Sequence, residues 1–475
     1  MKRIISIESK RTFYTILFIL CTTVSFSQLQ LPSFFGDNMV LQQKSMTSVW
    51  GKDAPNNKVI ISGSWNKSVV TNTDREGKWH VKLATPEAGG PYTLTIEGSE
   101  KIVLKNVLIG EVWICSGQSN MEMPLKGFKN QPVHGSEEVI ANASKNKIRL
   151  FNVDRKASLV PLNDVSGKWT VAQPQTAKDF SAVAHFFGKT LHDSLNNVPI
   201  GLISVAWGAS KVEAWMDEKT ITKFKNIEIE KEIPKEKPQR APVFVYNGMI
   251  HPLKGFTIKG FIWYQGEGNR ENAKEYADLF PAMIRQWRNQ WGHGDLPFYF
   301  VQIAPFGKES RIPVGALVRE SQLKTLQNVR NTGMAVTMDI GDCEFIHPPN
   351  KRQVGERLAY WALSKTYDMK DIIFSGPLYK KMIKTENGKI VLYFDYVDDG
   401  LSNFGHPLTG FEVAGRDRVF YPAIAEINED NTVTVFSELV KQPEAVRYGF
   451  KNCPTGTLFN SQGLPASPFR TDNWE

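Results

Sequence analysis

Residues 107–122 read VLIGEVWICSGQSNME, an apolar run that ends in glycine, serine and amide residues. The run at 107–115 carries one charge among mostly β-branched, aliphatic and aromatic side chains, which predicts a strand buried on both faces of a parallel sheet. The turn residues Gly117 and Ser119 come directly after it. Because ligands bind beyond the carboxyl ends of the strands in such sheets, this stretch predicts both the fold class and the place of a functional site.

Four more apolar runs continue the pattern, at residues 200–206, 258–264, 298–304 and 334–338. Between them, apolar residues recur at helical spacing at residues 180–195, 273–291, 315–327 and 350–363. Strands that alternate with helices in this way predict an α/β fold. We expect a doubly wound, flavodoxin-like parallel sheet of about five strands, with helices on both faces.

Short β-rich runs separated by turn residues flank this region on both sides. They fall at residues 48–51, 58–62, 79–83 and 92–96, and again at residues 389–394, 410–413, 432–436 and 445–449. The sequence therefore predicts an N-terminal β-sandwich-like domain at 28–105, an α/β domain at 106–366 and a β-rich, sandwich-like domain at 367–475.

The first 27 residues have the features of a signal peptide. Four basic residues precede an apolar stretch at 12–26, and small residues at 25 and 27 offer a cleavage site before Gln28. The apolar stretch is shorter than the roughly 20 residues that a bilayer span needs, and no later stretch reaches that length. We expect an exported protein, periplasmic or extracellular, without a membrane span.

Charge and cysteine content exclude several other classes. The formal net charge of +8 falls to +5 when the four Lys/Arg and one Glu of the leader are removed, and no basic cluster indicates nucleic-acid binding. The scattered histidines and cysteines show no zinc spacing, so we expect no metal. Cys115, Cys343 and Cys453 form an odd set that implies no disulfide framework, although Cys115 and Cys343 both lie near strand ends. The sequence does not indicate an oligomeric state.

Polar residues follow the first three strands of the expected sheet. Ser119 comes after the first strand in a tight turn, as an activated nucleophile requires. Gly208 follows the second strand, where a backbone N–H group can approach an oxyanion. Gln265 and Asn269 follow the third strand, and either side chain can donate a hydrogen bond to developing negative charge. Each feature alone is more often an ordinary turn, but the group predicts a hydrolase site.

The loop after the fifth strand adds a base. His347 comes three residues after Glu344, with Asp342 and Asp339 close before it. A carboxylate at this spacing can orient the imidazole ring while the other ring nitrogen takes a proton from a serine. All these residues fall at one edge of the predicted sheet, which favours a shared function over separate structural roles.

At these residues the chain resembles the sialate O-acetylesterase family, a branch of the SGNH hydrolases. The motifs that carry the resemblance are GQSNME at 117–122, GLI at 201–203 through WG at 207–208 to EAW at 213–215, YNGMIHP at 246–252, WYQGE at 263–267 and IHP at 346–348. The flanks are similar too, with NMVLQ at 38–42 and GLPASPFRTD at 463–472. The likeness extends over nearly the whole chain after the leader.

The resemblance implies a serine esterase that removes O-acetyl groups from carbohydrates, sialic acids above all, without a metal or an organic cofactor. It implies Ser119 as nucleophile and His347 as general base. By position, Gly208 and the Ser119 amide would form the oxyanion hole, with Gln265 favoured over Asn269 as the third donor.

The resemblance leaves the acid of the triad open. The acid of the superfamily stands three residues before the histidine, a position that Glu344 holds here. Asp342 and Asp339 compete with it, and a Ser–His dyad whose ring is oriented by a backbone carbonyl is a further alternative.

Two other functions compete with this interpretation. The same machinery would serve an esterase that deacetylates xylan or another plant-type polysaccharide. A non-catalytic carbohydrate-binding protein, with glycans held on some of the 12 tryptophans, is the alternative of another class. Trp113, Trp207, Trp263 and Trp361 lie in or beside predicted strands and helices, which favours a place in the core for them.

Overall fold

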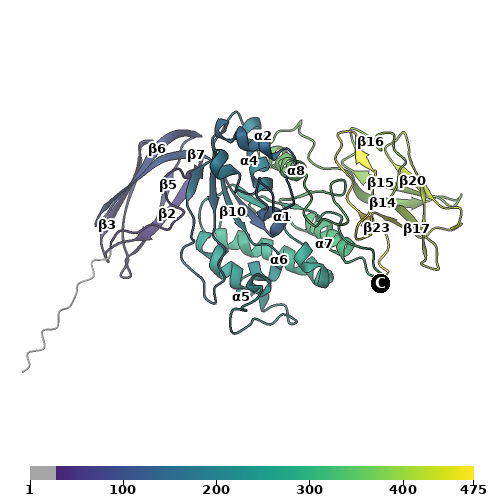
Figure 1. Cartoon of the computed structure of the whole chain (residues 1–475), viewed down its shortest axis with the longest axis horizontal. Coiled ribbons are helices and arrows are strands. Elements are labelled where there is room, and N and C mark those ends of the chain that lie inside the picture. Colours follow the sequence, from purple (N-terminus) through teal and green to yellow (C-terminus); the bar gives the residue numbers. More distant parts are fainter. Residues whose placement is uncertain (1–27, 475) are drawn as a thin grey trace, which may run out of the picture.

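The computed structural model describes residues 28–474, so the predicted signal peptide at residues 1–27 lies outside the described residues. Three regions follow one another along the longest axis of the molecule (Figure 1). Antiparallel strands occupy one end, a sheet covered by helices occupies the middle, and a second β-rich region occupies the other end. The coarse prediction of an α/β centre with a β-rich C-terminal region is confirmed.

The central sheet has the strand order β13-β12-β11-β7-β10-β8-β9. Its members are β7 (Lys101–Gly117), β8 (Ile148–Asn152), β9 (Trp169–Val171), β10 (Ile200–Ala206), β11 (Gly260–Tyr264), β12 (Phe298–Val301) and β13 (Thr332–Ala335). Neighbouring strands are parallel except β8 and β9, which pair antiparallel. The five strands expected from the sequence are present. Strands β8 and β9 were missed because they are short and carry polar residues.

Helices cover both faces of this sheet because its strands alternate their side chains between two apolar cores. Trp113 and Cys115 face a core shared with α4 (Ala182–Ser194) and α8 (Lys351–Lys365). Val112 and Ile114 face the other core, shared with α6 (Ala273–Trp291) and α7 (Val314–Asn328). The shorter helices are α1 (Ser119–Glu122), α2 (Ser136–Ala141), α3 (Pro174–Ala177) and α5 (Glu218–Ile221). In the described part of the chain, no helix is both long enough and apolar enough to cross a bilayer.

The N-terminal strands form two layers, and they pair antiparallel except the first, which lies parallel to β7. They are β1 (Val40–Gln42), β2 (Met46–Lys52), β3 (Lys58–Gly63), β4 (Lys67–Asn72), β5 (Lys78–Ala84) and β6 (Gly89–Glu97). Strand β2 pairs with β5, whereas β3 pairs with β4 and β6, and β6 pairs with β7. Strand β7 therefore belongs to this region and to the central sheet at once, so the expected domain limit between residues 105 and 106 falls inside one continuous strand.

The C-terminal region is all antiparallel. Its strands are β14 (Leu378–Lys384), β15 (Ile390–Asp395), β16 (Leu401–Ser402), β17 (Phe411–Ala414), β18 (Phe420–Pro422), β19 (Ile424–Ile427), β20 (Val433–Phe436), β21 (Ala445–Tyr448), β22 (Phe459–Asn460) and β23 (Phe469–Arg470). Two four-stranded sheets, β14-β15-β20-β19 and β18-β17-β21-β23, share a separate apolar core. A two-stranded pair, β16 with β22, completes the region.

The parallel register of the central sheet positions the candidate site. Gly117, the last residue of β7, lies opposite Ala206 of β10 and Tyr264 of β11. The three strands end level with one another, so the loops that follow them emerge at one edge. This register brings the loops of Ser119, Gly208 and Gln265 together, as the sequence pattern predicts.

Candidate active site

Ser119 stands at the turn between β7 and α1. Gly117 has a φ of +146°, and a Cβ atom there would lie 2.1 Å from the carbonyl oxygen of Tyr264, so only glycine fits. The next amide, that of Gln118, donates to the same carbonyl. The chain then enters the single turn of α1, which leaves the Ser119 side chain half-buried at the edge of the sheet.

His347 faces Ser119 across this edge from the loop between β13 and α8. Its Nε2 atom lies 2.8 Å from Ser119 Oγ, and its Nδ1 atom lies 2.7 Å from Oε1 of Gln131. The amide oxygen of Gln131 accepts the proton on Nδ1, which leaves Nε2 free to accept the proton of the serine. The ring also packs edge-on against Phe128, with 5.3 Å between the ring centroids. This is the nucleophile–base arrangement that acyl transfer requires.

The electrostatics of the site keep His347 neutral. Burial is the main cause that lowers the pKa of His347 to about 4, and the nearby positive charge of Lys351 contributes to that shift. Among residues 28–474 no carboxylate is hydrogen-bonded to the ring, and the partner of its Nδ1 atom is an uncharged amide. The imidazole is therefore in the base form at neutral pH.

The three candidate acids lie elsewhere, and the structure does not bring any of them to His347. Asp342 and Glu344 are exposed, and Asp342 Oδ1 accepts the backbone amides of Glu344 and Phe345 in a local turn. Asp339 forms a paired ion bridge with Arg357, at 2.7 and 2.6 Å. The expected acid–histidine contact is thus corrected. Spacing along a loop does not fix side-chain direction, and here Asp342 bonds to its own loop and Asp339 to α8.

Gly208 lies against Ser119, as expected. A Cβ atom at Gly208 would lie 3.4 Å from Ser119 Cβ. The Gly208 N–H donates to Oε2 of Glu122 at 2.9 Å, and Arg155 holds the other carboxylate oxygen at 2.6 Å. The Glu122 carboxylate thus occupies the Gly208 N–H group, which is the donor that a reacting oxyanion would need. The Ser119 N–H has no acceptor among the described residues.

Gln265 and Asn269 are buried next to each other, but neither offers a free donor. Gln265 Nε2 donates to the Ser210 carbonyl at 3.0 Å and to Asn269 Oδ1 at 2.7 Å. Asn269 Nδ2 donates to Glu213 at 2.7 Å and to Asn272 at 3.2 Å. Both amide nitrogens use both of their protons inside the protein. The expectation that one of them donates to the oxyanion is corrected, because their bonds join the loop after β11 to the loop after β10.

Several residues of this site were missed by the sequence interpretation. Gln131 lies on an irregular loop without a recognisable pattern. Glu122 and Asn120 lie inside the GQSNME motif, but nothing in their spacing assigns them a partner. Lys351 could have been noticed in the sequence, because a lysine at the first residue of a helix is unfavourable next to the positive end of the helix dipole. Its presence there suggests a role other than helix stability.

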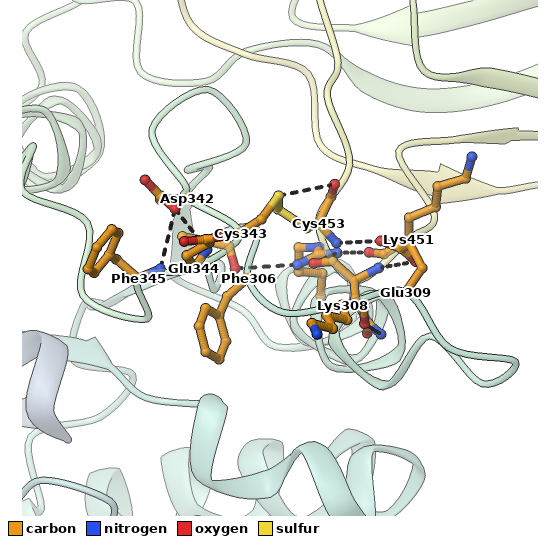
Figure 2. The surroundings of a disulfide bond; sticks show 12 residues. Phe306, Lys308, Glu309, Asp342, Cys343, Glu344, Phe345, Lys451 and Cys453 are labelled. Carbon is orange, nitrogen blue, oxygen red and sulfur yellow. Dashed lines mark hydrogen bonds between the residues drawn. A yellow bond between two sulfur atoms is a disulfide. The ribbon is translucent and has the colours of Figure 1, made fainter.

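A disulfide bond ties the loop of His347 to the C-terminal region (Figure 2). Cys343 is bonded to Cys453, at a sequence separation of 110 residues. Around the bond, the Gly307 amide donates to the Cys343 carbonyl, and Glu309 accepts the amides of Asn452 and Cys453. Cys115 is free and buried, and burial raises its pKa well above the usual value. The cysteine count implied no disulfide framework and left the state of the three cysteines open, whereas the structure pairs Cys343 with Cys453 and leaves Cys115 free.

The described residues contain no cluster of three or more His, Cys, Asp or Glu side chains that would suit a metal ion. What the site does contain is a serine, an imidazole with a fixed tautomer and two backbone N–H groups beside the serine. These groups are sufficient for nucleophilic acyl transfer.

Comparison with known proteins points to the same chemistry. Residues 109–364 match the family described as carbohydrate esterase, sialic acid-specific acetylesterase. The sialate O-acetylesterase of Mus musculus is 29% identical, with 92% of this chain and 93% of the mouse protein covered. That of Homo sapiens is 32% identical over 74% of this chain and 73% of the human protein. A crystal structure of a carbohydrate acetylesterase from Xanthomonas citri is 39% identical, covers 94% of this chain and 100% of that one, and has a TM-score of 0.87.

Proposed function

The chain belongs to the sialic acid-specific acetylesterase family of carbohydrate esterases, and from this premise we propose that it removes O-acetyl groups from sugars with Ser119 as nucleophile and His347 as base. As a member of this family it is a carboxylic ester hydrolase. The observation that carries the residue assignment is the line of contacts from Ser119 Oγ to His347 Nε2 at 2.8 Å and from Nδ1 to Gln131 at 2.7 Å.

The proposed reaction has two steps. Ser119 Oγ attacks the acetyl carbonyl carbon while its proton passes to His347 Nε2. The bond between the acetyl carbon and the sugar oxygen then breaks, the sugar oxygen takes the proton from Nε2, and the acetyl group stays on Ser119. A water molecule, deprotonated by the same nitrogen, releases acetate and restores the serine hydroxyl.

Backbone N–H groups stabilise the negative oxygen in this proposal. The Ser119 N–H has no acceptor in the described residues, and the Gly208 N–H is bonded to Glu122. When substrate binds, the acetyl oxygen replaces Glu122 Oε2 as the acceptor of the Gly208 N–H group. The position of Oε2 in this structure therefore indicates where the negative oxygen of the reaction would lie. Arg155 retains the displaced carboxylate through the ion pair that it already makes.

Sialic acids are the proposed substrate class. The mouse and human relatives are named sialate O-acetylesterases, and the family model carries the same specificity in its description. The Xanthomonas relative is described more broadly, as a carbohydrate acetylesterase. Deacetylation of a plant-type polysaccharide is therefore the outcome that a substrate test must separate from the proposed one.

We also propose an SGNH-hydrolase-like catalytic domain at residues 106–366, between an N-terminal domain at 28–105 and a C-terminal domain at 367–475. The parallel sheet with helices on both faces supports the first assignment. Export after cleavage before Gln28 is part of the proposal. The Cys343–Cys453 disulfide supports it, since such bonds persist in oxidising compartments.

The test is acetate release by the purified protein from an O-acetylated sialoside and from an acetylated xylo-oligosaccharide, with Ser119→Ala assayed beside the parent. We expect the parent to prefer the sialoside, and the variant to lose about three orders of magnitude or more in kcat on both. Faster release from the xylo-oligosaccharide would overturn the substrate assignment. A fully active Ser119→Ala protein would overturn the nucleophile assignment.

A further inference from the structure

A buried polar network lies directly behind the Ser119–His347 pair and has no role in the reaction described above. Its members are Asn120, Glu267 and Lys351. They come from the turn after β7, the loop after β11 and the first residue of α8. Asn120 and Lys351 have no exposed surface at all. Buried charged groups are costly unless they are paired, so a cluster of this kind needs an explanation.

Asn120 connects the two halves of the site. Its Nδ2 atom donates to the Ile346 carbonyl at 3.0 Å and to Glu267 Oε1 at 2.5 Å. Asn120 directly follows Ser119 in the chain, and Ile346 directly precedes His347. One side-chain amide therefore joins the neighbour of the nucleophile to the neighbour of the base.

Lys351 fixes the other end of that amide. Its Nζ atom donates to Asn120 Oδ1 at 2.5 Å and lies 5.5 Å from the centroid of the Tyr264 ring. With Oδ1 held by an ammonium group, the orientation of the Asn120 amide is set, and Nδ2 must face Ile346 and Glu267. The ammonium group lies near the positive end of the dipole of α8, which is unfavourable, so its contacts with Asn120 and Tyr264 must compensate for this repulsion.

We propose that Lys351 and Asn120 are positioning residues, which hold the His347 loop against the Ser119 turn, and that the Lys351 charge adds to the effect of burial in holding His347 in its base form. This inference rests on the proposed roles of Ser119 and His347. The network acts through those two residues and makes no contact with the substrate in the proposal.

The charges around the network determine its pH behaviour. Lys351 is the cation that acts on His347, whereas the other contacts of the ring, Ser119, Gln131 and Phe128, are uncharged. Burial lowers the pKa of Lys351 to about 7, and Glu267 opposes that shift.

Glu267 and the charges beyond it complete the surroundings. Burial raises the pKa of Glu267, while its bond to Asn120 and the charges of Lys351 and Arg270 act against the rise. On the far side of Ser119, Glu122 is paired with Arg155. Because the pKa of Lys351 is about 7, Lys351 is fully protonated at about pH 4, where His347 titrates. Its positive charge disfavours protonation of the imidazole there.

The test uses Lys351→Met, which keeps the length and apolar stem of the side chain, with p-nitrophenyl acetate as substrate. For the parent, kcat/KM should stay level from about pH 6, where Lys351 is protonated, down to about pH 4 and fall below that value, since only neutral His347 is active. In Lys351→Met this acid limb should move to higher pH, because the cation that disfavours the imidazolium is gone. We also expect kcat to fall about tenfold with KM changed less than about twofold.

Asn120→Ala separates the two roles, because it removes the link but leaves the Lys351 charge. We expect a similar loss of kcat with the acid limb still near pH 4. Arg352→Met is the matched control, since Arg352 is the next cation on α8 and lies over the Phe186 ring at 4.9 Å. Its acid limb and kcat should match those of the parent.

The inference is overturned if folded Lys351→Met keeps both the acid limb and kcat of the parent. It is also overturned if Asn120→Ala turns over substrate at the parental rate. This second variant keeps the test decisive if circular dichroism shows that Lys351→Met is not folded. These outcomes differ from failure of the proposed function, in which Ser119→Ala itself would stay active.

Discussion

Gln131 occupies the place that a carboxylate takes in a Ser-His-Asp triad. Its amide oxygen lies 2.7 Å from His347 Nδ1, so it orients the ring and fixes the tautomer. An amide carries no net charge and therefore cannot stabilise the imidazolium as a carboxylate would. The consequence is a base that stays neutral to low pH, in agreement with the lowered pKa of His347.

This arrangement leads to a prediction about three side chains. Gln131→Ala should reduce kcat for p-nitrophenyl acetate about tenfold or more, because the imidazole loses the group that orients it. Glu344→Ala and Asp342→Ala should stay within about twofold of the parent, since both carboxylates are exposed and neither contacts the ring. Steady-state kinetics on the three variants decide the matter. A larger loss of kcat in Glu344→Ala than in Gln131→Ala would instead support Glu344 as the acid, as the loop spacing predicts.

At the residue scale, the sequence pattern predicted the positions that depend on strand ends. Ser119, Gly208 and His347 come together because parallel strands in register end at one edge of the sheet. The structure does not bring the expected acid to His347 and shows no spare donor on Gln265 or Asn269. Their assignment depends on where a side chain points within a loop, and Asp342 and Gln265 point to partners that no spacing rule reveals.

The elements themselves were largely predictable from apolar patterns. The run at 200–206 corresponds residue for residue to β10, and the amphipathic stretch at 273–291 corresponds to α6. Strand β8 was missed because its five residues include Arg149 and the terminal Asn152. The antiparallel edge strand β9, with three residues, offers too short a pattern for any periodicity.

The loop between β13 and α8 is the element on which the base depends, and the disulfide anchors it. Cys343 stands four residues before His347. We expect the Cys343→Ser/Cys453→Ser double variant to lose about 3 kcal/mol of unfolding free energy, within the usual range for a lost disulfide. It should also lose severalfold in kcat, because the loop of His347 becomes less restricted.

Denaturant unfolding and p-nitrophenyl acetate kinetics measure both effects. Dithiothreitol on the parent should reproduce the loss, whereas the double variant should not respond to it, since its remaining described cysteine, Cys115, is a buried free thiol. Unchanged kcat and stability in the double variant would mean that the loop is held by its hydrogen bonds alone.

At the scale of the whole molecule, the two flanking regions are joined to the centre in different ways. The N-terminal region shares β7 and one continuous apolar core with the central sheet. The C-terminal region has a core of its own and is joined to the centre by the disulfide, by polar contacts such as Arg470 with Glu320 on α7, and by a few apolar contacts such as Tyr396 with Trp361 on α8. Sequence patterns predicted three regions, but they could not predict a shared strand, because an uninterrupted strand carries no boundary signal.

Composition had its own limits at this scale. The charge distribution gave no indication of nucleic-acid binding, and the odd cysteine count did not reveal the disulfide. Cys343 and Cys453 are 110 residues apart and pair only because the fold brings the C-terminal region against the loop of His347. The tryptophans are mostly structural, as expected. Trp113 and Trp263 are fully buried, and Trp361 nearly so, whereas Trp207 is partly exposed beside Gly208.

In the proposed reaction, Ser119 carries the acetyl group between the two steps. Peptide mass spectrometry after an acid quench, during turnover of p-nitrophenyl acetate, tests this most directly. We expect one acetyl group on the peptide that contains Ser119 in the parent, and none on that peptide in Ser119→Ala. An acetyl group carried by another residue during turnover, or parental turnover by Ser119→Ala, would contradict it.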